Sequence, residues 1–249
     1  MFTELVLHRT FANLSWPAFA VAAWASFMYI RSKTAEDRAF YDWSSSVGLT
    51  WGVGFLMLQP LVGFTIVYAL KLSQPENPVS GAAAGGSFER LTSGETSNIL
   101  LMNLILVVVL IVLSNVAMYF GAGRHPDHAG RVPIRFFGLV AAVAGVYSVS
   151  PLADFPYGSP LFYLRYIALL VMVLATLGAF ITYLRGRLRF RYGSPGRSYR
   201  IVLMATGVVA AVIALNMGLM KSNSRVPFTV YNQPGYTVEP GPPPSGFGQ

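Results

Sequence analysis

Histidine is the residue type in this sequence best suited to hold a redox cofactor. The 249 residues contain three histidines and no cysteine, so Cys-ligated iron–sulfur clusters, thiolate metal sites and CxxCH haem attachment are excluded. His8 stands beside Arg9 at the start of the first apolar run. From there a histidine can reach a b-type haem held between helices, or it can bond a neighbouring helix at the membrane surface.

The other two histidines are poorly placed to bind a metal. His125 and His128 lie in the sequence GRHPDHAGR between two apolar runs. Pro126 disfavours the helix on which residues three apart would share a face. We therefore expect no metal site.

A few uncharged polar residues stand within apolar runs. Gln59 and Pro60 lie at the centre of residues 47–70, where the amide and the missing backbone donor both require neighbouring helices. A later run carries three asparagines, which we expect to bond across helices rather than to bind a ligand: Asn98, Asn103 and Asn115. The core of each run lacks Asp, Glu, Lys and Arg, which weighs against a proton pump or an ion-coupled transporter.

The composition indicates that these residues are positioned by transmembrane helices. Hydrophobic residues make up 54% of the chain, charged residues 11%, and the mean hydropathy is +0.52. This predicts an all-α integral membrane protein, because each apolar run is close to the roughly 20 residues that span a bilayer. We expect about six spans, at residues 12–30, 47–70, 98–120, 134–151, 161–184 and 201–220.

The distribution of Lys and Arg predicts the orientation. Of 18 basic residues, twelve fall in connections on one side, including Arg124, Arg200 and the run LRGRLRFR at 184–191, and six fall on the other. The positive-inside rule therefore places both termini on the outer, periplasmic face of a bacterial inner membrane. The formal charge of +8 is explained by this topology, and we expect no nucleic-acid partner.

The chain divides into a transmembrane domain, residues 1–225, and a Pro- and Gly-rich tail, residues 226–249. We expect the first span to be retained rather than cleaved, since a basic leader does not precede it. Recurring proline makes the tail non-helical. It either lies extended along a partner subunit or is a disordered terminus.

Two segments resemble subunit I of cytochrome bd quinol oxidases. Residues 7–54, LHRTFANLSW through WGVG, resemble its start, with Arg and Phe opening helix one and a short cytoplasmic hairpin before a glycine-bearing helix two. Residues 217–231, MGLMKSNSRVPFTVY, resemble its GRQPW segment, with Arg225, Pro227 and Phe228 matching Arg, Pro and Trp. The family's outer placement of both termini agrees with the predicted topology.

The sequence departs from this family at its functional positions. The resemblance implies a haem-ligating histidine where Ala18 and Phe19 stand, and glutamates where Gln59 and Ser222 stand. The family's larger helix count and long quinol-binding loop are also missing. The resemblance thus implies shared ancestry with loss of haem ligands, and a chain that is not catalytic by itself.

These observations lead to one main hypothesis and two alternatives. The main hypothesis is a membrane subunit of a respiratory electron-transfer complex that scaffolds cytochrome partners and walls a quinone or haem pocket through His8, Arg9, Gln59 and Arg225. No catalytic residue is assigned, and lipid is a further expected partner. The first alternative is a small quinol-oxidising subunit with one haem b, held by His8 and Met217 or Met220. The second is a transporter or channel for a small neutral molecule.

Overall fold

The computed structural model describes the chain except for residue 1, residues 74–93, 157–158 and 160, and residues 224–249. The described part is all-helical, which confirms the all-α part of the predicted fold class. Its six long helices are α1 (Phe2–Arg31), α2 (Ala35–Ser73), α4 (Gly94–Gly121), α5 (His128–Val149), α6 (Leu164–Gly186) and α7 (Arg197–Asn223). Three short 3-10 helices follow α4, α5 and α6: η1 (Ala122–Arg124), η2 (Pro151–Ala153) and η3 (Arg187–Arg189).

Within the described ranges, four segments are long and apolar enough to cross a membrane: Asn98–Arg124, His128–Val149, Leu164–Arg189 and Arg197–Leu219. A length of about 20 residues at 1.5 Å per residue matches the hydrocarbon core. The other two predicted spans, residues 12–30 and 47–70, fall within helices α1 and α2, which have 30 and 39 residues. That all six cross the bilayer, with both termini on the outer face, stays a prediction.

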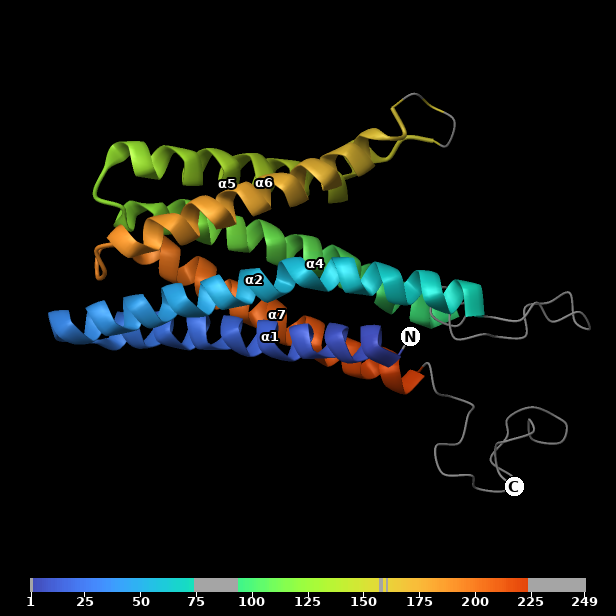
Figure 1. The fold of residues 1–249 in the computed structure, drawn as a ribbon, viewed down its shortest axis with the longest axis horizontal. Helices are drawn as coiled ribbons and strands as arrows, with labels where there is room; N and C mark the ends of the chain where they lie inside the picture. The colour runs from blue at the N-terminus through green and yellow to red at the C-terminus, as the bar shows by residue number, and fades with distance from the viewer. Residues whose placement is uncertain (1, 74–93, 157–158, 160, 224–249) are drawn as a thin grey trace, which may run out of the picture.

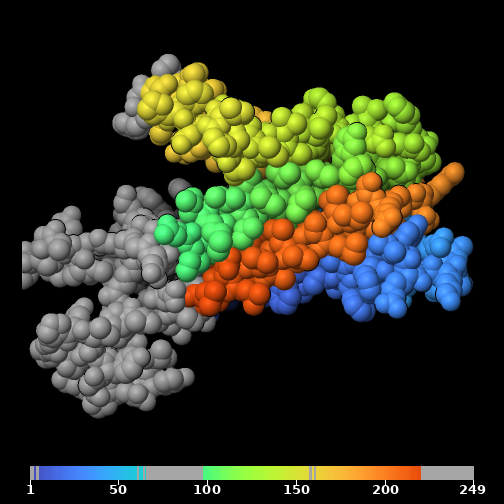
Figure 2. Space-filling view, turned by 180° about the vertical axis from the view of Figure 1, so that it is seen from behind, coloured from blue at the N-terminus to red at the C-terminus, as the bar shows by residue number. Residues whose placement is uncertain are grey.

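The helices run along one long axis (Figure 1). Helices α1 and α2 form one antiparallel pair and α5 and α6 another, while α4 and α7 pack between them. The described start of α1 and the described end of α7 lie at the same end of the molecule. At that end the α5–α6 pair diverges from α4, which leaves an opening in the surface (Figure 2).

Small residues allow the tightest helix crossings. A Cβ added at Gly48 of α2 would lie 2.6 Å from the Ala18 carbonyl oxygen of α1 and 2.8 Å from the Ala22 nitrogen. At the α1–α7 crossing, a Cβ at Gly207 would lie 2.4 Å from the Ala23 Cβ. Small residues at such contacts are typical of membrane helices, because backbones can then approach closely without a water-driven hydrophobic effect.

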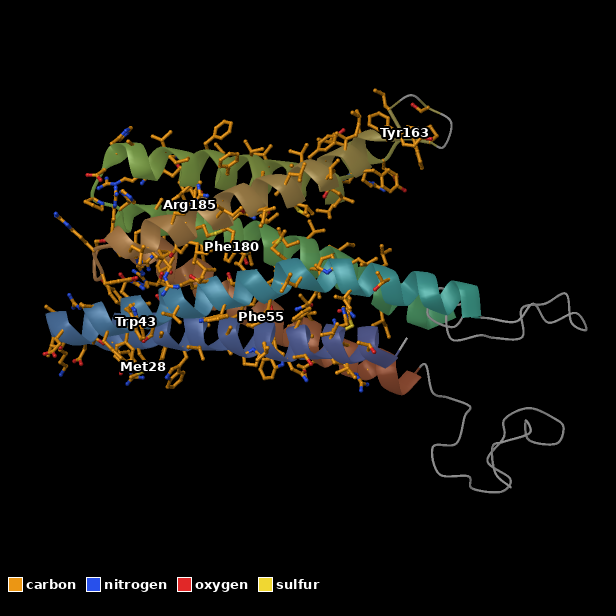
Figure 3. The ribbon with its side chains drawn as sticks, viewed as in Figure 1. Met28, Trp43, Phe55, Tyr163, Phe180 and Arg185 are labelled. Carbon is orange, nitrogen blue, oxygen red and sulfur yellow. The ribbon has the colours of Figure 1, made fainter. Side chains whose placement is uncertain are left out.

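Exposed aromatic residues mark both ends of the bundle. Trp24 and Trp43 are exposed near the α1–α2 turn, and Tyr163 and Tyr166 are exposed at the far end of α6. Figure 3 shows Trp43 and Tyr163 at opposite ends of the long axis. Tryptophan and tyrosine concentrate at the two membrane–water interfaces. Trp16 and Trp51 are also exposed, at mid-length of α1 and α2, so part of the exposed aromatic residues follows this preference.

Helix α5 begins at His128 and ends at Val149, so its bounds differ from the expected 134–151. Pro133 lies inside the helix rather than before it, whereas Pro151 begins the separate turn η2. Helices α1 and α2 likewise continue through Pro17 and Pro60. Proline removes a single backbone donor, and tertiary packing can hold a long apolar helix together across such a gap.

Candidate functional site: a buried charge centre

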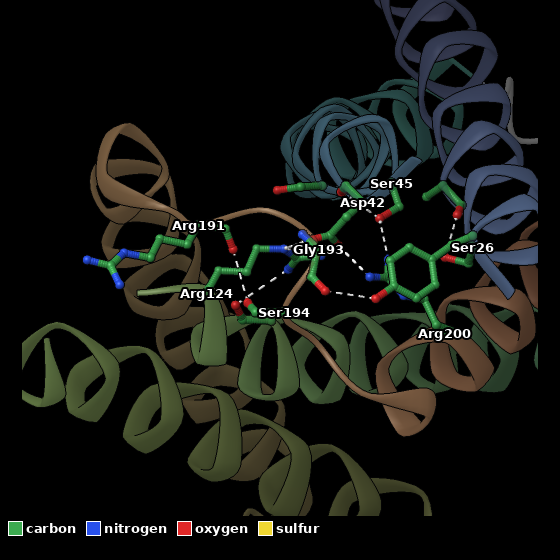
Figure 4. A network of polar contacts seen from close by, with 12 residues as sticks. Ser26, Asp42, Ser45, Arg124, Arg191, Gly193, Ser194 and Arg200 are labelled. Carbon is green, nitrogen blue, oxygen red and sulfur yellow. Dashed lines mark hydrogen bonds and ion pairs between the residues drawn. The ribbon is translucent and has the colours of Figure 1, made fainter. Parts of the chain in front are cut away.

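An aspartate and two arginines meet near the α1–α2 turn, as Figure 4 shows. We call Asp42, Arg124 and Arg200 the charge centre. The two Asp42 carboxylate oxygens accept hydrogen bonds from Arg124 Nε at 3.2 and 3.1 Å, and one of them also accepts a bond from Arg124 Nη2. The Arg200 Nη2 atom donates to the same carboxylate at 2.7 Å. All three side chains are 0% exposed.

Three separate parts of the chain supply these groups. Asp42 lies in the second turn of α2, Arg124 ends η1 after α4, and Arg200 lies in the first turn of α7. Each residue is at the border of an apolar segment, where a charged side chain can either enter water or turn inward. Here all three side chains turn inward. Arg124 and Arg200 lie 82 and 158 residues after Asp42 in the sequence, so their bonds to Asp42 join distant helices.

Aromatic rings lie against the guanidinium groups of both Arg124 and Arg200. The Arg200 guanidinium carbon lies 3.6 Å from the centre of the Tyr29 ring and 4.9 Å from that of Tyr199. The Arg124 guanidinium lies 4.2 Å from the same Tyr199 ring. The faces of aromatic rings carry partial negative charge, so they attract cations that one carboxylate does not fully neutralise.

Hydroxyl groups extend the centre to a fourth helix. The Arg124 Nη1 donates to Tyr183 Oη of α6 at 3.1 Å, and Tyr183 Oη lies 3.1 Å from Ser46 Oγ of α2. The Arg200 Nη1 donates to Ser45 Oγ at 3.1 Å. The charge centre therefore ties α2, α6, α7 and the end of α4 together at one place.

The connection between α6 and α7 is fastened to the same centre. The Gly193 N–H donates to Asp42 Oδ2 at 2.7 Å, and the Gly193 carbonyl accepts a bond from Tyr29 Oη at 2.8 Å. Gly193 has φ +92°, a conformation that other residues rarely adopt. The Arg191 N–H donates to the Arg124 carbonyl at 2.9 Å. These bonds fix the path of the connection.

The contacts of the charge centre join helices. Its three side chains are buried and bond one another, while the buried Arg200 Nε atom has no hydrogen-bond partner among the described residues. A buried ion pair adds little net stability compared with apolar packing, but losing one partner leaves an uncompensated buried charge. Such a centre strongly disfavours partly assembled arrangements of the helices.

Two of the four predicted site residues share one interface. His8 of α1 faces Gly63 of α2, where an added Cβ would lie 3.2 Å from His8 Cε1. One turn earlier in α2, Gln59 Nε2 donates to the Phe11 carbonyl of α1 at 3.5 Å. Gln59 therefore has a partner on a neighbouring helix, as its position in the apolar run requires. The His8 Nδ1 atom is buried and has no hydrogen-bond partner among the described residues.

The other two predicted site residues do not join this interface. Arg9 is exposed, and Arg225 lies outside the described residues, as do Pro227 and Phe228 and the tail. Of the candidate haem ligands in the alternative hypothesis, Met217 is exposed on α7 and the Met220 side chain is not described. Among the described residues, the structure thus brings two of the predicted site residues, His8 and Gln59, to one interface.

The remaining polar residues named in the sequence analysis divide between buried contacts and exposed positions. Asn115 Nδ2 of α4 donates to Thr176 Oγ1 of α6 at 2.8 Å, a cross-helix bond of the kind expected for this residue. Asn103 is buried, whereas Asn98 is exposed. His125 is buried against Phe190, and His128 is exposed at the start of α5. Within the described part of the chain, no group of three His, Cys, Asp or Glu side chains is placed to hold a metal.

The sequence did not reveal the charge centre. Counting basic residues treated Arg124 and Arg200 as solvated topology signals, yet the structure buries both. The available signal was their position directly against apolar runs, in GAGR and SYRIVL, together with Asp42 directly before Trp43 and a run of three serines.

Comparison with family models, curated proteins and solved structures finds no match to this chain.

Proposed function

We propose that this chain is a membrane subunit of a respiratory electron-transfer complex, related to subunit I of cytochrome bd quinol oxidases, in a bacterial inner membrane. In this proposal its main task is to scaffold cytochrome partners. The observation that supports a scaffold is the charge centre, in which Asp42, Arg124 and Arg200 are fully buried and bond one another. Its charges hold helices together and do not face a cleft.

The outer faces of two helices provide surfaces for neighbours. On α5, a stripe of exposed apolar residues recurs at helical spacing: Phe136, Leu139, Val143 and Val146. On α7, exposed apolar residues recur every seven positions at Ile201, Val208 and Leu215. A seven-residue repeat presents one continuous seam to a partner helix. These stripes support a subunit that packs against other membrane helices.

The α1–α2 interface is the part of this chain that we propose as the wall of a haem or quinone pocket. His8 and Gln59 lie there, and Arg9 is exposed next to His8 in sequence. A guanidinium at this position suits a haem propionate, a lipid phosphate or a quinone carbonyl, because it donates several hydrogen bonds in one plane.

One observation favours the first alternative, a small quinol-oxidising subunit with haem b. The buried His8 Nδ1 without a hydrogen-bond partner among the described residues is a group that a bound cofactor would satisfy. The transporter alternative gains no such support. Gln59 contacts α1 and Asn115 contacts α6, so these amides belong to different helix pairs and do not define one polar pathway.

The proposal is tested by isolating the complex through a tag on this chain in mild detergent. We expect cytochrome subunits to co-purify. The Arg9→Leu variant should slow electron transfer through the complex while assembly stays intact, and Arg38→Leu, at the opposite end of the bundle, should behave as wild type. Purification without any cytochrome partner, or loss of assembly in Arg9→Leu, would overturn the proposal.

A further inference from the structure

The turn between α6 and α7 concentrates positive charge. We call residues 185–197 the arginine turn; it contains five arginines, at positions 185, 187, 189, 191 and 197. No Asp or Glu occurs between Asp154 and Glu239 in the sequence. The α1–α2 turn at the same end carries two exposed acids, Glu36 and Asp37, but also three exposed basic residues, Arg31, Lys33 and Arg38, so it does not neutralise the arginines. Four of the five arginines are exposed, and Arg187 is half-buried. In Figure 4 the Arg191 side chain points away from the charge centre.

The neighbouring α4–α5 turn does not neutralise this charge. The turn contributes one exposed acid, Asp127, and the start of α5 adds two half-buried arginines, Arg131 and Arg135. Arg131 is occupied locally, because its Nε donates to the His125 carbonyl at 2.6 Å. Beneath the surface, the charge centre holds two guanidinium groups and one carboxylate, so it adds to the positive potential of this end.

The arginine turn is held in a fixed conformation. The backbone at Arg191 and Gly193 bonds Arg124, Asp42 and Tyr29, and Ser194 Oγ donates to the Arg191 carbonyl at 3.0 Å. A fixed backbone lowers the entropy that the exposed arginines lose on binding. Solvated charges that merely set topology need no such attachment.

A protruding apolar residue stands among these arginines. Leu188, in η3 between Arg187 and Arg189, is 95% exposed. The arginine turn connects two of the segments that are apolar enough to span a membrane, Leu164–Arg189 and Arg197–Leu219, so it lies where the hydrocarbon ends. At that depth an exposed leucine can enter the acyl region while adjacent guanidinium groups reach phosphates.

We propose that the arginine turn binds the phosphate headgroups of anionic phospholipids, with Leu188 inserted between the lipids. Guanidinium groups match phosphate oxygens in a bidentate geometry that an ammonium group cannot reproduce. This inference rests on the membrane-spanning part of the proposed function and on none of its redox part. An acidic segment of a partner protein is the competing ligand, and a wild-type chain that does not discriminate between the two lipids in the experiment below would favour it.

The test uses the full chain purified in detergent and titrated with phosphatidylglycerol or with phosphatidylcholine of the same acyl chains. Bound lipids are counted by native mass spectrometry. We expect phosphatidylglycerol to bind at least about tenfold more tightly, since each arginine near an anionic surface contributes roughly a fivefold preference. Arg187→Gln/Arg189→Gln/Arg191→Gln should abolish the preference, and the corresponding three lysine substitutions should reduce it.

A matched control removes three positive charges from the α1–α2 turn at the same end of the bundle: Arg31→Gln/Lys33→Gln/Arg38→Gln. This variant should keep the preference. Equal loss in both variants would show a non-specific charge effect, and displacement of phosphatidylglycerol by glycerol phosphate at similar concentration would show a free-phosphate site. Either result, or a wild-type chain that does not discriminate between the lipids, would overturn the inference. A glutamine variant that fails to fold leaves the lysine variant to decide.

Discussion

Replacing Asp42 with asparagine removes the only carboxylate of the charge centre and keeps its size. The carboxylate receives bonds from Arg124, Arg200 and the Gly193 N–H, and the side chains of the three charged residues are 0% exposed. The variant leaves two buried guanidinium groups without an anion. Breaking a buried pair in this way costs about 3–5 kcal/mol. For a chain of this size, that lowers the melting temperature by roughly 6–20 °C.

Size-exclusion chromatography of detergent-solubilised protein after stepwise heating measures this change. Asp154→Asn is the matched control, because Asp154 is 74% exposed and its oxygen lies 3.4 Å from Arg165 Nη2. An exposed ion pair contributes about 0–1 kcal/mol, so the control should melt close to wild type. If Asp42→Asn and Asp154→Asn melt together, the charge centre does not hold the helices as described.

Replacing all three residues of the charge centre with apolar ones should cost less stability than removing Asp42 alone. The triple variant Asp42→Leu/Arg124→Met/Arg200→Met removes every charge at once, and buried ion networks replaced by apolar residues are often neutral in stability. It should therefore melt at a higher temperature than Asp42→Asn. A triple variant that melts below Asp42→Asn would mean that packing geometry, rather than uncompensated charge, causes the loss.

Other contacts give smaller effects that the same heating assay resolves. Asn115→Ala removes the bond to Thr176 and should lower the free energy of unfolding by on the order of 1 kcal/mol. An unchanged melting temperature would show that this bond does not contribute to the stability of the fold. Gly48→Ala places a Cβ 2.6 Å from the Ala18 carbonyl oxygen and should destabilise by about 1–3 kcal/mol. Gly218→Ala, with nothing within 4 Å of its added Cβ, should be neutral or stabilising by about 0.5–1 kcal/mol, and a loss as large as that of Gly48→Ala would contradict the packing described.

The helices were largely predictable because they depend on local composition. Apolar runs of bilayer length, without charge in their cores, predicted an all-α membrane domain, and the long helices overlap those runs. Gln59 and Asn115 each required a partner on another helix, and each has one. These results follow from the cost of an unsatisfied polar group in an apolar surrounding, which is a property of the residue itself.

The charge centre was not predictable, because it depends on contacts between distant segments. Asp42, Arg124 and Arg200 border apolar runs, where an ionised side chain enters water in most membrane proteins. Whether it turns inward depends on a counter-charge arriving from a segment 82 or 158 residues away. Sequence spacing carries no information on that encounter, whereas the packing of α2, α7 and the end of α4 determines it.

A reduced-minus-oxidised absorption spectrum, recorded on the isolated chain and on the complex that co-purifies with it, tests the scaffold proposal most directly. The proposal predicts a colourless isolated chain and a complex with cytochrome bands. A b-type band from the isolated chain would contradict it and favour the small haem-binding subunit, with His8 as the first residue to replace. A complex without cytochrome bands would remove the respiratory assignment altogether.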